Sequence, residues 1–350
     1  MHKQNFTPTM ASLTIPTNYS TVRPITKMSS FVLQNTSEQD VALNGSTDEF
    51  DYIITSDGHG QGAHKHALRD LFESLDWSSI LQNENWYKND VDEGAYISPL
   101  FAQLHSDTTA FSKTTATYQG CTLSVVLIYP DRFECFTIGD STIKIWEKSG
   151  DSWQRTFVSV DHDMDFEEAQ LKARDRNDAL FCRGHWRNKG VVVKNGIRTK
   201  DINRLKALGA TKMTMEQSAY FYFDDGSLLN MTRALGHYPT DSVIEKAKEA
   251  GHVLSCTEYS LTKVVVERKT DVKYALINAT DGVWDVTAED VEKTFIDSIV
   301  KDENAAERCV RKVKQLWSQE WEYWRSGINT GNTRLPDWNH DDIGCSVAYC

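Results

Sequence analysis

The chain has 350 residues and a formal net charge of −12 at pH 7, and 40% of its residues are hydrophobic. This length allows one large domain or two ordinary ones, with enough apolar residues for a sizeable core. The acidic balance argues against binding to nucleic acid or to anionic membrane surfaces, since both require clustered lysines and arginines. No apolar run reaches the roughly 18 residues of a membrane span.

The cysteines indicate a reducing environment. There are seven, they form no C-x-x-C pair, and most lie within apolar runs. A reduced cysteine in such a run packs as a small hydrophobe, whereas a disulfide framework would need paired spacings. The first residues also lack the apolar core of a secretory signal. We therefore expect a cytoplasmic protein, and a monomer because no coiled-coil pattern or interface stripe is visible.

In chain order, residues 1 to about 28 are rich in Ser, Thr, Pro and Asn and predict a flexible or irregular N-terminal arm. Strands are expected at residues 29–33 and 50–56, with a polar turn at residues 44–46 between them. Apolar residues then recur at helical spacing from Ala67 to Leu75, and a second helix is expected at residues 98–115. The next strands are predicted at residues 121–129, 133–138, 142–146 and 153–158.

The second half of the chain begins with a short predicted helix at residues 166–174. Residues 177–226 are polar and locally basic, which predicts a surface insertion or flap. The elements predicted after it are a helix at 241–250, strands at 257–267 and 274–278, helices at 288–301 and 305–325, and a last strand from residue 343. Antiparallel-style strands interrupted twice by helix pairs indicate an α+β layered fold, because the strict β-α alternation of a doubly wound sheet is absent.

Three acidic corners are the most informative pattern. Asp-Gly-His-Gly at residues 57–60 ends a strand-like run, Asp-Gly at 281–282 recurs in the same setting, and Asp-Asp at 341–342 directly precedes the last apolar run. Carboxylates at strand ends can converge in space, and they repel one another unless protons or cations intervene. The corners therefore predict a site for a hard metal ion.

Each candidate residue also has a plainer interpretation. Asp281 and Asp285 can cap the helix that follows them, as acids near a helix start often do. His59 can stabilise its turn, and Asp140 can belong to an ordinary Gly-Asp-Ser turn. Taken singly, these residues leave both interpretations open.

Several motifs follow one another in a fixed order: Asp57-Gly58-His59-Gly60, Gly120-Cys121-Thr122-Leu123, Ile138-Gly139-Asp140-Ser141, Asp161-His162-Asp163, the run at 229–236, the run at 279–285, and Asp341-Asp342-Ile343. This series resembles the metal-dependent Ser/Thr protein phosphatases of the PPM (type 2C) family, from about residue 37 to the C-terminus. The resemblance implies one phosphatase domain over residues 29–350. It also implies a β-sandwich of two mainly antiparallel sheets flanked by helix pairs, a four-layer αββα fold.

The resemblance also implies metal ligands. Asp57 matches the aspartate that bridges two divalent cations, and Gly58 matches the glycine whose carbonyl oxygen binds one of them. Asp281 and Asp341 match the remaining carboxylate ligands of the other ion. Two further positions, Asp140 and Asp285, match acids that help to hold a weaker third metal in some members.

Two catalytic residues follow in the same way. His59 matches the histidine proposed as general acid, and Asp40 matches the second member of an acidic pair that precedes the first corner. The implied activity is hydrolysis of phosphoserine and phosphothreonine in proteins by a metal-activated water, with two or more Mg²⁺ or Mn²⁺ ions. The chemistry agrees, because such ions neutralise phosphate charge, acidify water and prefer carboxylate and carbonyl oxygens.

The sequence departs from the family pattern near its start. Gln39 replaces the glutamate that ligates the second metal, and Asn35 stands where an arginine holds phosphate. A one-residue slip would instead offer Glu38 as the ligand. His237 lies where Gly-Asp is usual, and Gly344 replaces a hydroxyl residue.

These departures keep other functions open. Arg183, Arg187 and Arg198 in the predicted flap are candidates for binding phosphate, although a solvated basic loop is the better explanation for any one of them. A phosphatase-like domain that has lost catalysis and acts as a binding or regulatory module is the alternative function. A hydrolase of small phosphorylated metabolites would share the same chemistry.

Overall fold

The structure is a computed structural model. It describes residues 26–35, 37–59, 66–83, 86–87, 120–162, 187–188, 191–193, 197–199, 217–218, 221–222, 228–229, 231, 233–236, 261–325, 328–334 and 336–350. The predicted helices at 98–115, 166–174 and 241–250, nearly all of the N-terminal arm, and most of the predicted flap lie outside these residues. So do Arg183 and His237.

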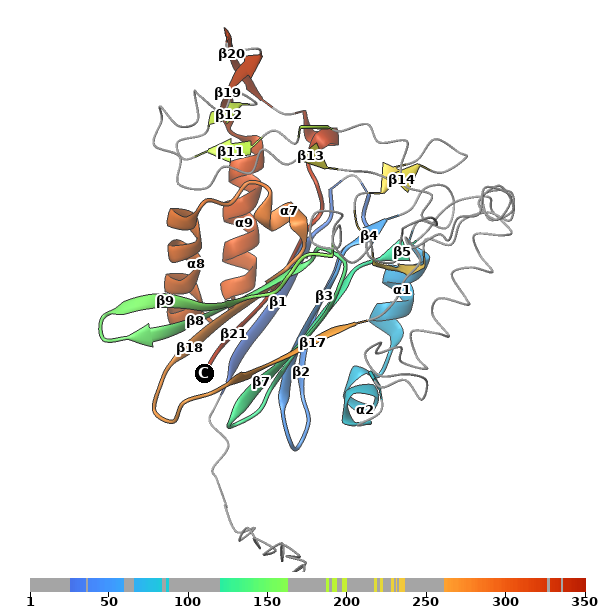
Figure 1. Cartoon of the computed structure of the whole chain (residues 1–350), viewed down its shortest axis with the longest axis vertical. Helices are drawn as coiled ribbons and strands as arrows, with labels where there is room; N and C mark the ends of the chain where they lie inside the picture. Colours follow the sequence, from blue (N-terminus) through green and yellow to red (C-terminus); the bar gives the residue numbers. More distant parts are fainter. Residues whose placement is uncertain are drawn as a thin grey trace, which may run out of the picture.

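Two antiparallel five-stranded sheets form the centre of the molecule (Figure 1). The first sheet has the order β1 (Lys27–Leu33), β21 (Ile343–Tyr349), β18 (Tyr274–Ala279), β8 (Thr142–Ser149) and β9 (Ser152–Val158). The second has the order β17 (Thr262–Glu267), β7 (Arg132–Ile138), β6 (Leu123–Ile128), β3 (Asp51–Ser56) and β2 (Val41–Ser46). Every neighbouring pair is antiparallel.

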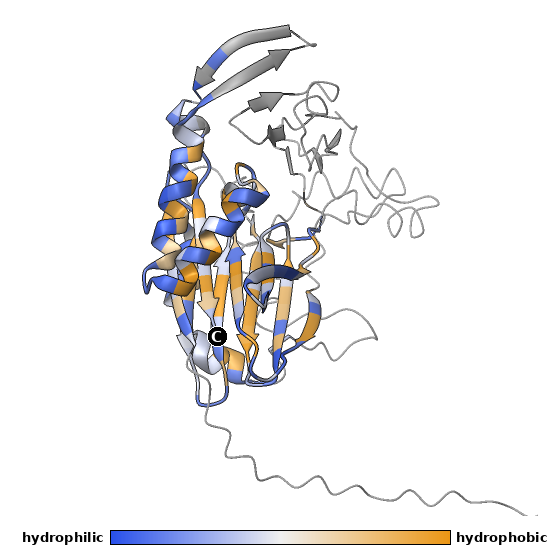
Figure 2. Cartoon of the chain, turned by 90° about the vertical axis from the view of Figure 1, so that its left-hand side faces the viewer, coloured by the Kyte–Doolittle hydropathy of each residue, from blue (hydrophilic) through white to orange (hydrophobic). Residues whose placement is uncertain are grey.

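The central strands are buried on both faces, which is why their sequences are continuous apolar runs. Every residue of β3, β6 and β18 is buried. One apolar cluster fills the space between the sheets, with Ile53 and Val126 from the second sheet and Ile145 and Leu276 from the first. Figure 2 shows this concentration of hydrophobic residues along the strands.

Helix pairs cover both outer faces. The first sheet carries α8 (Glu289–Lys301) and α9 (Ala305–Ser318), whose buried residues pack on Ala275 and Ile277 of β18. The second sheet carries α1 (Ala67–Ser74) and α2 (Trp77–Gln82), which join a separate apolar cluster with residues of β3 and β6. The four-layer αββα arrangement predicted from the sequence is therefore confirmed.

The predicted turn at residues 44–46 is wrong. These residues end strand β2, and the turn follows at residues 47–50, closed by a 2.8 Å hydrogen bond from Thr47 N to Phe50 O. Gly45 lies opposite Tyr52 in the strand register. A Cβ at position 45 would come within 2.3 Å of the Tyr52 hydroxyl, so the glycine makes room for that ring rather than forming a turn.

The predicted helix at residues 305–325 is too long. Helix α9 ends at Ser318, and the following residues form strand β19 (Glu320–Arg325), which pairs with β20 (Ile328–Arg334). Trp321 and Tyr323 alternate with charged residues, which is the period of a strand and not of a helix. The predicted strand at 121–129 is also divided, at Thr122, into β5 (Gly120–Cys121) and β6.

Short strands complete the described chain. β4 (Gly58–His59), β5 and β16 (Leu235–Gly236) form a three-stranded sheet beside the first acidic corner. The others are β10 (Arg187–Asn188), β11 (Val191–Val193), β12 (Ile197–Thr199), β13 (Gln217–Ser218), β14 (Phe221–Tyr222) and β15 (Leu228–Leu229). The five cysteines in the described part of the chain are free and buried. None of the helices in that part has the length and apolar character needed to cross a membrane.

Candidate functional site

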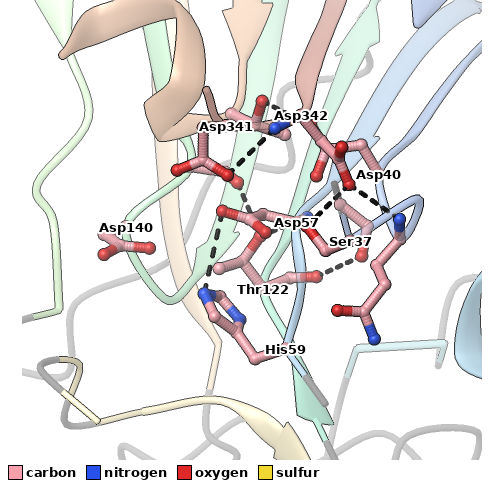
Figure 3. A network of polar contacts seen from close by, with 12 residues as sticks. Ser37, Asp40, Asp57, His59, Thr122, Asp140, Asp341 and Asp342 are labelled. Atoms are coloured by element: carbon pink, nitrogen blue, oxygen red, sulfur yellow. Dashed lines mark hydrogen bonds and ion pairs between the residues drawn. The ribbon is translucent and has the colours of Figure 1, made fainter. Parts of the chain in front are cut away.

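The acidic corners meet at one end of the sandwich because of the strand connections. Asp40 directly precedes β2 and Asp57 directly follows β3, and these two strands are antiparallel neighbours. Likewise, Asp341 shortly precedes β21 and Asp281 follows β18 after one residue, and these strands are neighbours in the other sheet. The start of one antiparallel strand lies beside the end of its neighbour, so each sheet supplies two carboxylates to the same end. Figure 3 shows three of them, Asp40, Asp57 and Asp341.

The glycines of the two Asp-Gly corners allow these segments to approach closely. A Cβ at Gly58 would lie 2.6 Å from Cβ and 2.7 Å from O of Gln39. A Cβ at Gly282 would lie 1.9 Å from the carbonyl oxygen of Asp342. No other residue fits without moving the neighbouring backbone. The repeated Asp-Gly pattern thus serves close packing of the acidic segments as well as the acids themselves.

The four carboxylates lie close enough to affect one another electrostatically. Burial raises the pKa of Asp57 well above its ordinary range, and repulsion from Asp281, Asp40 and Asp341 adds to this rise. The pKa of Asp341 is raised by burial and then by Asp281, Asp40 and Asp285. Burial, followed by repulsion from Asp342, likewise raises the pKa of Asp40. Close, buried carboxylates of this kind favour bound protons or a cation between them.

Asp281 and Asp285 do not act as N-terminal caps. Helix α7 (Asp281–Trp284) begins at Asp281, and its cap residue, Thr280, makes no capping hydrogen bond with its side chain. Instead, Thr280 Oγ1 donates to Asp40 Oδ2 over 2.8 Å and accepts from the Gly344 amide over 3.0 Å. Asp281 Oδ1 is buried without a hydrogen-bond partner among the described residues. Asp285 is exposed at the other end of α7.

Asp342 has a structural role that the sequence did not reveal. Its carboxylate accepts hydrogen bonds from the amides of Asn35 and Gln39, at 2.6 and 2.8 Å, and from the Ser37 hydroxyl at 3.0 Å. It therefore fixes the segment that leads into Asp40. These partners lie more than 300 residues away in sequence, and no local pattern signals such a contact.

Asn35 and Gln39 are built into this segment. The Asn35 side chain donates to the Asp341 carbonyl oxygen and accepts from Lys314 Nζ at 3.0 Å. Gln39 is 4% exposed, and its backbone packs against Gly58. Both departures from the family pattern therefore lie at the acidic group rather than away from it.

Glu38 does not replace the missing glutamate by a one-residue slip. Its backbone is left-handed, with φ of 57°. Its carbonyl oxygen accepts from Arg69 Nη1 at 2.6 Å and is 2.9 Å from His66 Nδ1, and its carboxylate is 3.7 Å from His66 Nε2. The side chain thus faces the start of α1, and the left-handed backbone is a strained conformation of the kind found at functional sites.

His59 and Asp140 lie at the edge of the group (Figure 3). His59 Nε2 is 3.8 Å from Asp57 Oδ2, and the imidazole is 31% exposed (Figure 3). Asp140 lies at the edge of the group in the turn between β7 and β8. That turn needs Gly139, whose φ is 92° and whose amide donates to Nδ1 of the buried His162 over 3.1 Å. Gly139 also packs on Thr122, whose hydroxyl accepts from the Asp57 amide at 2.9 Å.

The residues fit a hard divalent cation. As placed, none of the described residues form a ready set of three metal-binding side chains. The buried Asp281 oxygen without a partner and the raised pKa values of its neighbours are both relieved by a cation that prefers oxygen ligands.

The sequence matches the profile of a known protein family. Residues 26–318 match the family profile described as Protein phosphatase 2C. The chain therefore belongs to the protein phosphatase 2C family. No curated protein matches the sequence.

Solved structures of phosphatases are similar to this chain at low sequence identity. The serine-threonine phosphatase 2C of Toxoplasma gondii is 16% identical with a TM-score of 0.53, over 95% of this chain and 96% of that one. The Mycobacterium tuberculosis phosphatase PstP/Ppp is 14% identical with a TM-score of 0.42, over 92% and 97%. A structure of the PstP catalytic domain, with the same values, is a complex with two manganese ions.

Proposed function

We propose that this protein is a Mg²⁺- or Mn²⁺-dependent phosphatase that hydrolyses phosphoserine and phosphothreonine in proteins. The observation that carries the proposal is the convergence of four carboxylates, Asp40, Asp57, Asp281 and Asp341, from both sheets. Membership of the phosphatase family supports the substrate class. We further propose a cytoplasmic monomer, and the free buried cysteines in the described residues support the reducing compartment.

The proposed ligands divide into strong and weak sets. Asp57, Asp281 and Asp341 would hold one ion, and Asp57 with the Gly58 carbonyl would contribute to a second. Asp140 and Asp285, which lie further out, are the proposed ligands of a weaker third ion. When bound, such ions neutralise the phosphate dianion and acidify a water molecule. Gln39 is neutral, so we expect the second ion to bind less tightly than a glutamate would allow.

The protein's own groups supply proton transfer and orientation. His59 is proposed to protonate the departing serine or threonine oxygen, because it lies beside Asp57 and its partial exposure lets it exchange protons with solvent. Asp40 is buried, accepts a hydrogen bond from the Thr280 hydroxyl and has a pKa raised by burial, and it is proposed to exchange a proton within the acidic group.

The direct test is hydrolysis of para-nitrophenyl phosphate and of a phosphothreonine peptide with added Mn²⁺. We expect EDTA to abolish activity. Asp281→Asn should lower kcat/KM by more than the roughly 10- to 100-fold typical of residues outside the ligand shell. Asp151→Asn, at an exposed turn, is the matched control and should leave activity unchanged. Activity that survives both EDTA and Asp281→Asn would disprove the proposal.

A regulatory module without catalysis is the second candidate, favoured by Gln39 and Asn35. Calorimetric titration with Mn²⁺ separates the two, because a module that has lost the site would bind no ion. A comparison of kcat/KM for the phosphothreonine peptide and for free phosphoserine tests the substrate class. A preference for free phosphoserine would indicate a metabolite hydrolase.

A further inference from the structure

The side chain of Lys314 reaches the acidic group from helix α9. Its Nζ is 3.0 Å from Asn35 Oδ1 and 2.8 Å from His340 Nδ1, and the lysine is half-buried. An ammonium group can only donate hydrogen bonds, so the imidazole nitrogen must be the acceptor. Both partners are therefore neutral acceptors.

This lysine has no carboxylate partner among the described residues, which sets it apart from the other sequestered lysines. Lys144 Nζ lies 2.6 Å from Glu292, and Lys263 Nζ lies 2.8 Å from Glu134. For Lys314, two of the three ammonium hydrogens are used by Asn35 and His340. A half-buried positive charge without a counter-ion favours an anionic ligand.

Both hydrogen-bond partners of Lys314 are next to Asp341, a candidate metal ligand. Asn35, one partner of Lys314, donates from Nδ2 to the carbonyl oxygen of Asp341. His340, the other partner, directly precedes Asp341 and is 2% exposed. The ammonium group is thus held at the border of the acidic group by two residues whose own positions are fixed.

A phosphate that enters this site would face several carboxylates. Positively charged groups that contact the phosphate oxygens would offset the repulsion between the phosphate and these carboxylates. A lysine can do so because it binds phosphate as a point charge and needs no planar geometry. We propose that Lys314 binds an oxygen of the substrate or product phosphate, with Asn35 and His340 as positioning residues. This inference rests on the proposed phosphatase function and assigns one of its binding residues.

The test compares three variants of helix α9. Lys314→Gln keeps a hydrogen-bond donor but removes the charge, Lys314→Arg keeps the charge, and Lys312→Gln removes a charge from an exposed position of the same helix. With saturating Mn²⁺, we expect Lys314→Gln to raise the inhibition constant of inorganic phosphate and the KM for para-nitrophenyl phosphate by roughly tenfold or more. Lys314→Arg should stay within about threefold of the native values, and Lys312→Gln should match them.

Two further measurements distinguish a failure of this inference from a failure of the proposed phosphatase function. Mn²⁺ affinity by calorimetry should be unchanged in Lys314→Gln, since the lysine is not a ligand. An unchanged inhibition constant in a folded Lys314→Gln protein would overturn the inference while the phosphatase function stands. If the native protein shows no Mn²⁺-dependent hydrolysis, calorimetry of inorganic phosphate with Mn²⁺ present still tests the lysine. Lys314→Met, which keeps the aliphatic stem, is the second neutral variant if the glutamine variant folds poorly.

Discussion

At the scale of the residue, two glycines determine how closely the acidic segments approach. The Asp-Gly pattern is common in turns, and its local meaning is a flexible corner. Here the glycine that follows each aspartate lies against the backbone that carries another acid, Gln39-Asp40 at one corner and Asp341-Asp342 at the other. The glycine is therefore a packing residue of the site.

We predict that Gly282→Ala destabilises the protein by about 1–3 kcal/mol, the usual cost of an overpacked interior, because its Cβ would lie 1.9 Å from Asp342 O. It should also weaken Mn²⁺ binding, since Asp281 and Asp341 would be pushed apart. Urea unfolding and calorimetric titration measure the two effects. Gly150→Ala is the control, because nothing lies within 4 Å of its Cβ. That control should cost only about 1–2 kcal/mol through its left-handed backbone and leave Mn²⁺ binding intact. Native Mn²⁺ affinity in Gly282→Ala would contradict the packing role.

At the scale of the element, a buried ion pair holds helix α7 and thereby Asp281. Lys144 of β8 and Glu292 of α8 pair at 2.6 Å, and Arg155 of β9 reaches the same carboxylate at 3.1 Å. The Lys144 ammonium also lies 3.7 Å from the ring centre of Trp284, the last residue of α7. Three elements of secondary structure are thus joined to the helix that begins at the candidate metal ligand.

We predict that Glu292→Ala destabilises the protein by about 3–5 kcal/mol, because it removes the carboxylate that pairs with the buried Lys144 ammonium group. Glu289→Ala, at an exposed position of the same helix, should change stability by no more than about 0.5 kcal/mol. The double variant Lys144→Met with Glu292→Leu should recover part of the loss, since no charge is then buried. Urea unfolding of the four proteins checks the set. Equal stability of Glu292→Ala and Glu289→Ala would show that the pair contributes nothing.

At the scale of the whole molecule, the candidate site spans both sheets. Near the site, the sheets are joined by a buried polar layer in which Asn278 Oδ1 accepts from Thr55 Oγ1 at 2.6 Å and Ser346 Oγ donates to Ile54 O at 2.8 Å. Beyond that layer the carboxylates of opposite sheets repel one another. A bound cation would convert this repulsion into a link between the sheets.

The pH dependence of metal-free stability follows from the raised pKa values of Asp40, Asp57 and Asp341. An acid whose pKa is higher in the folded than in the unfolded state stabilises the fold while protonated. That contribution is complete below the ordinary pKa and is lost as the pH rises through the folded-state value. We therefore predict that Asp57→Asn raises the melting temperature of the metal-free protein more at pH 7 than at pH 4.

Mn²⁺ should restore the stability that the metal-free native protein loses at pH 7 when these carboxylates ionise. At 100 times its dissociation constant, an ion that binds only the folded state stabilises it by about 2.7 kcal/mol. Calorimetric melting with EDTA and with Mn²⁺ measures the shift. In Asp57→Asn the Mn²⁺ shift should be small. The prediction would be refuted if the melting temperature of the native protein changed neither with pH nor on addition of Mn²⁺.

The sequence by itself predicted most of the central elements and the family. Short apolar runs located the central strands, and helical spacing located helices α1, α8 and the first part of α9. The ordered acidic motifs led to the phosphatase family, which the family profile confirmed. Predictions from local sequence were wrong where the same residue or pattern is compatible with two structures. Gly45 favours a turn but makes room for Tyr52, and the amphipathic run of α9 continues into residues whose period is that of a strand.

Only the tertiary structure decided which groups meet at the site. Asp342 holds the segment before Asp40, and Lys314 reaches Asn35 across 279 residues of sequence. Such contacts depend on strand order and register, which fix the position of each side chain in space. No short window of sequence contains both partners. The sequence could therefore predict which residues belong to the candidate site, but it could not predict which side chains contact one another in space.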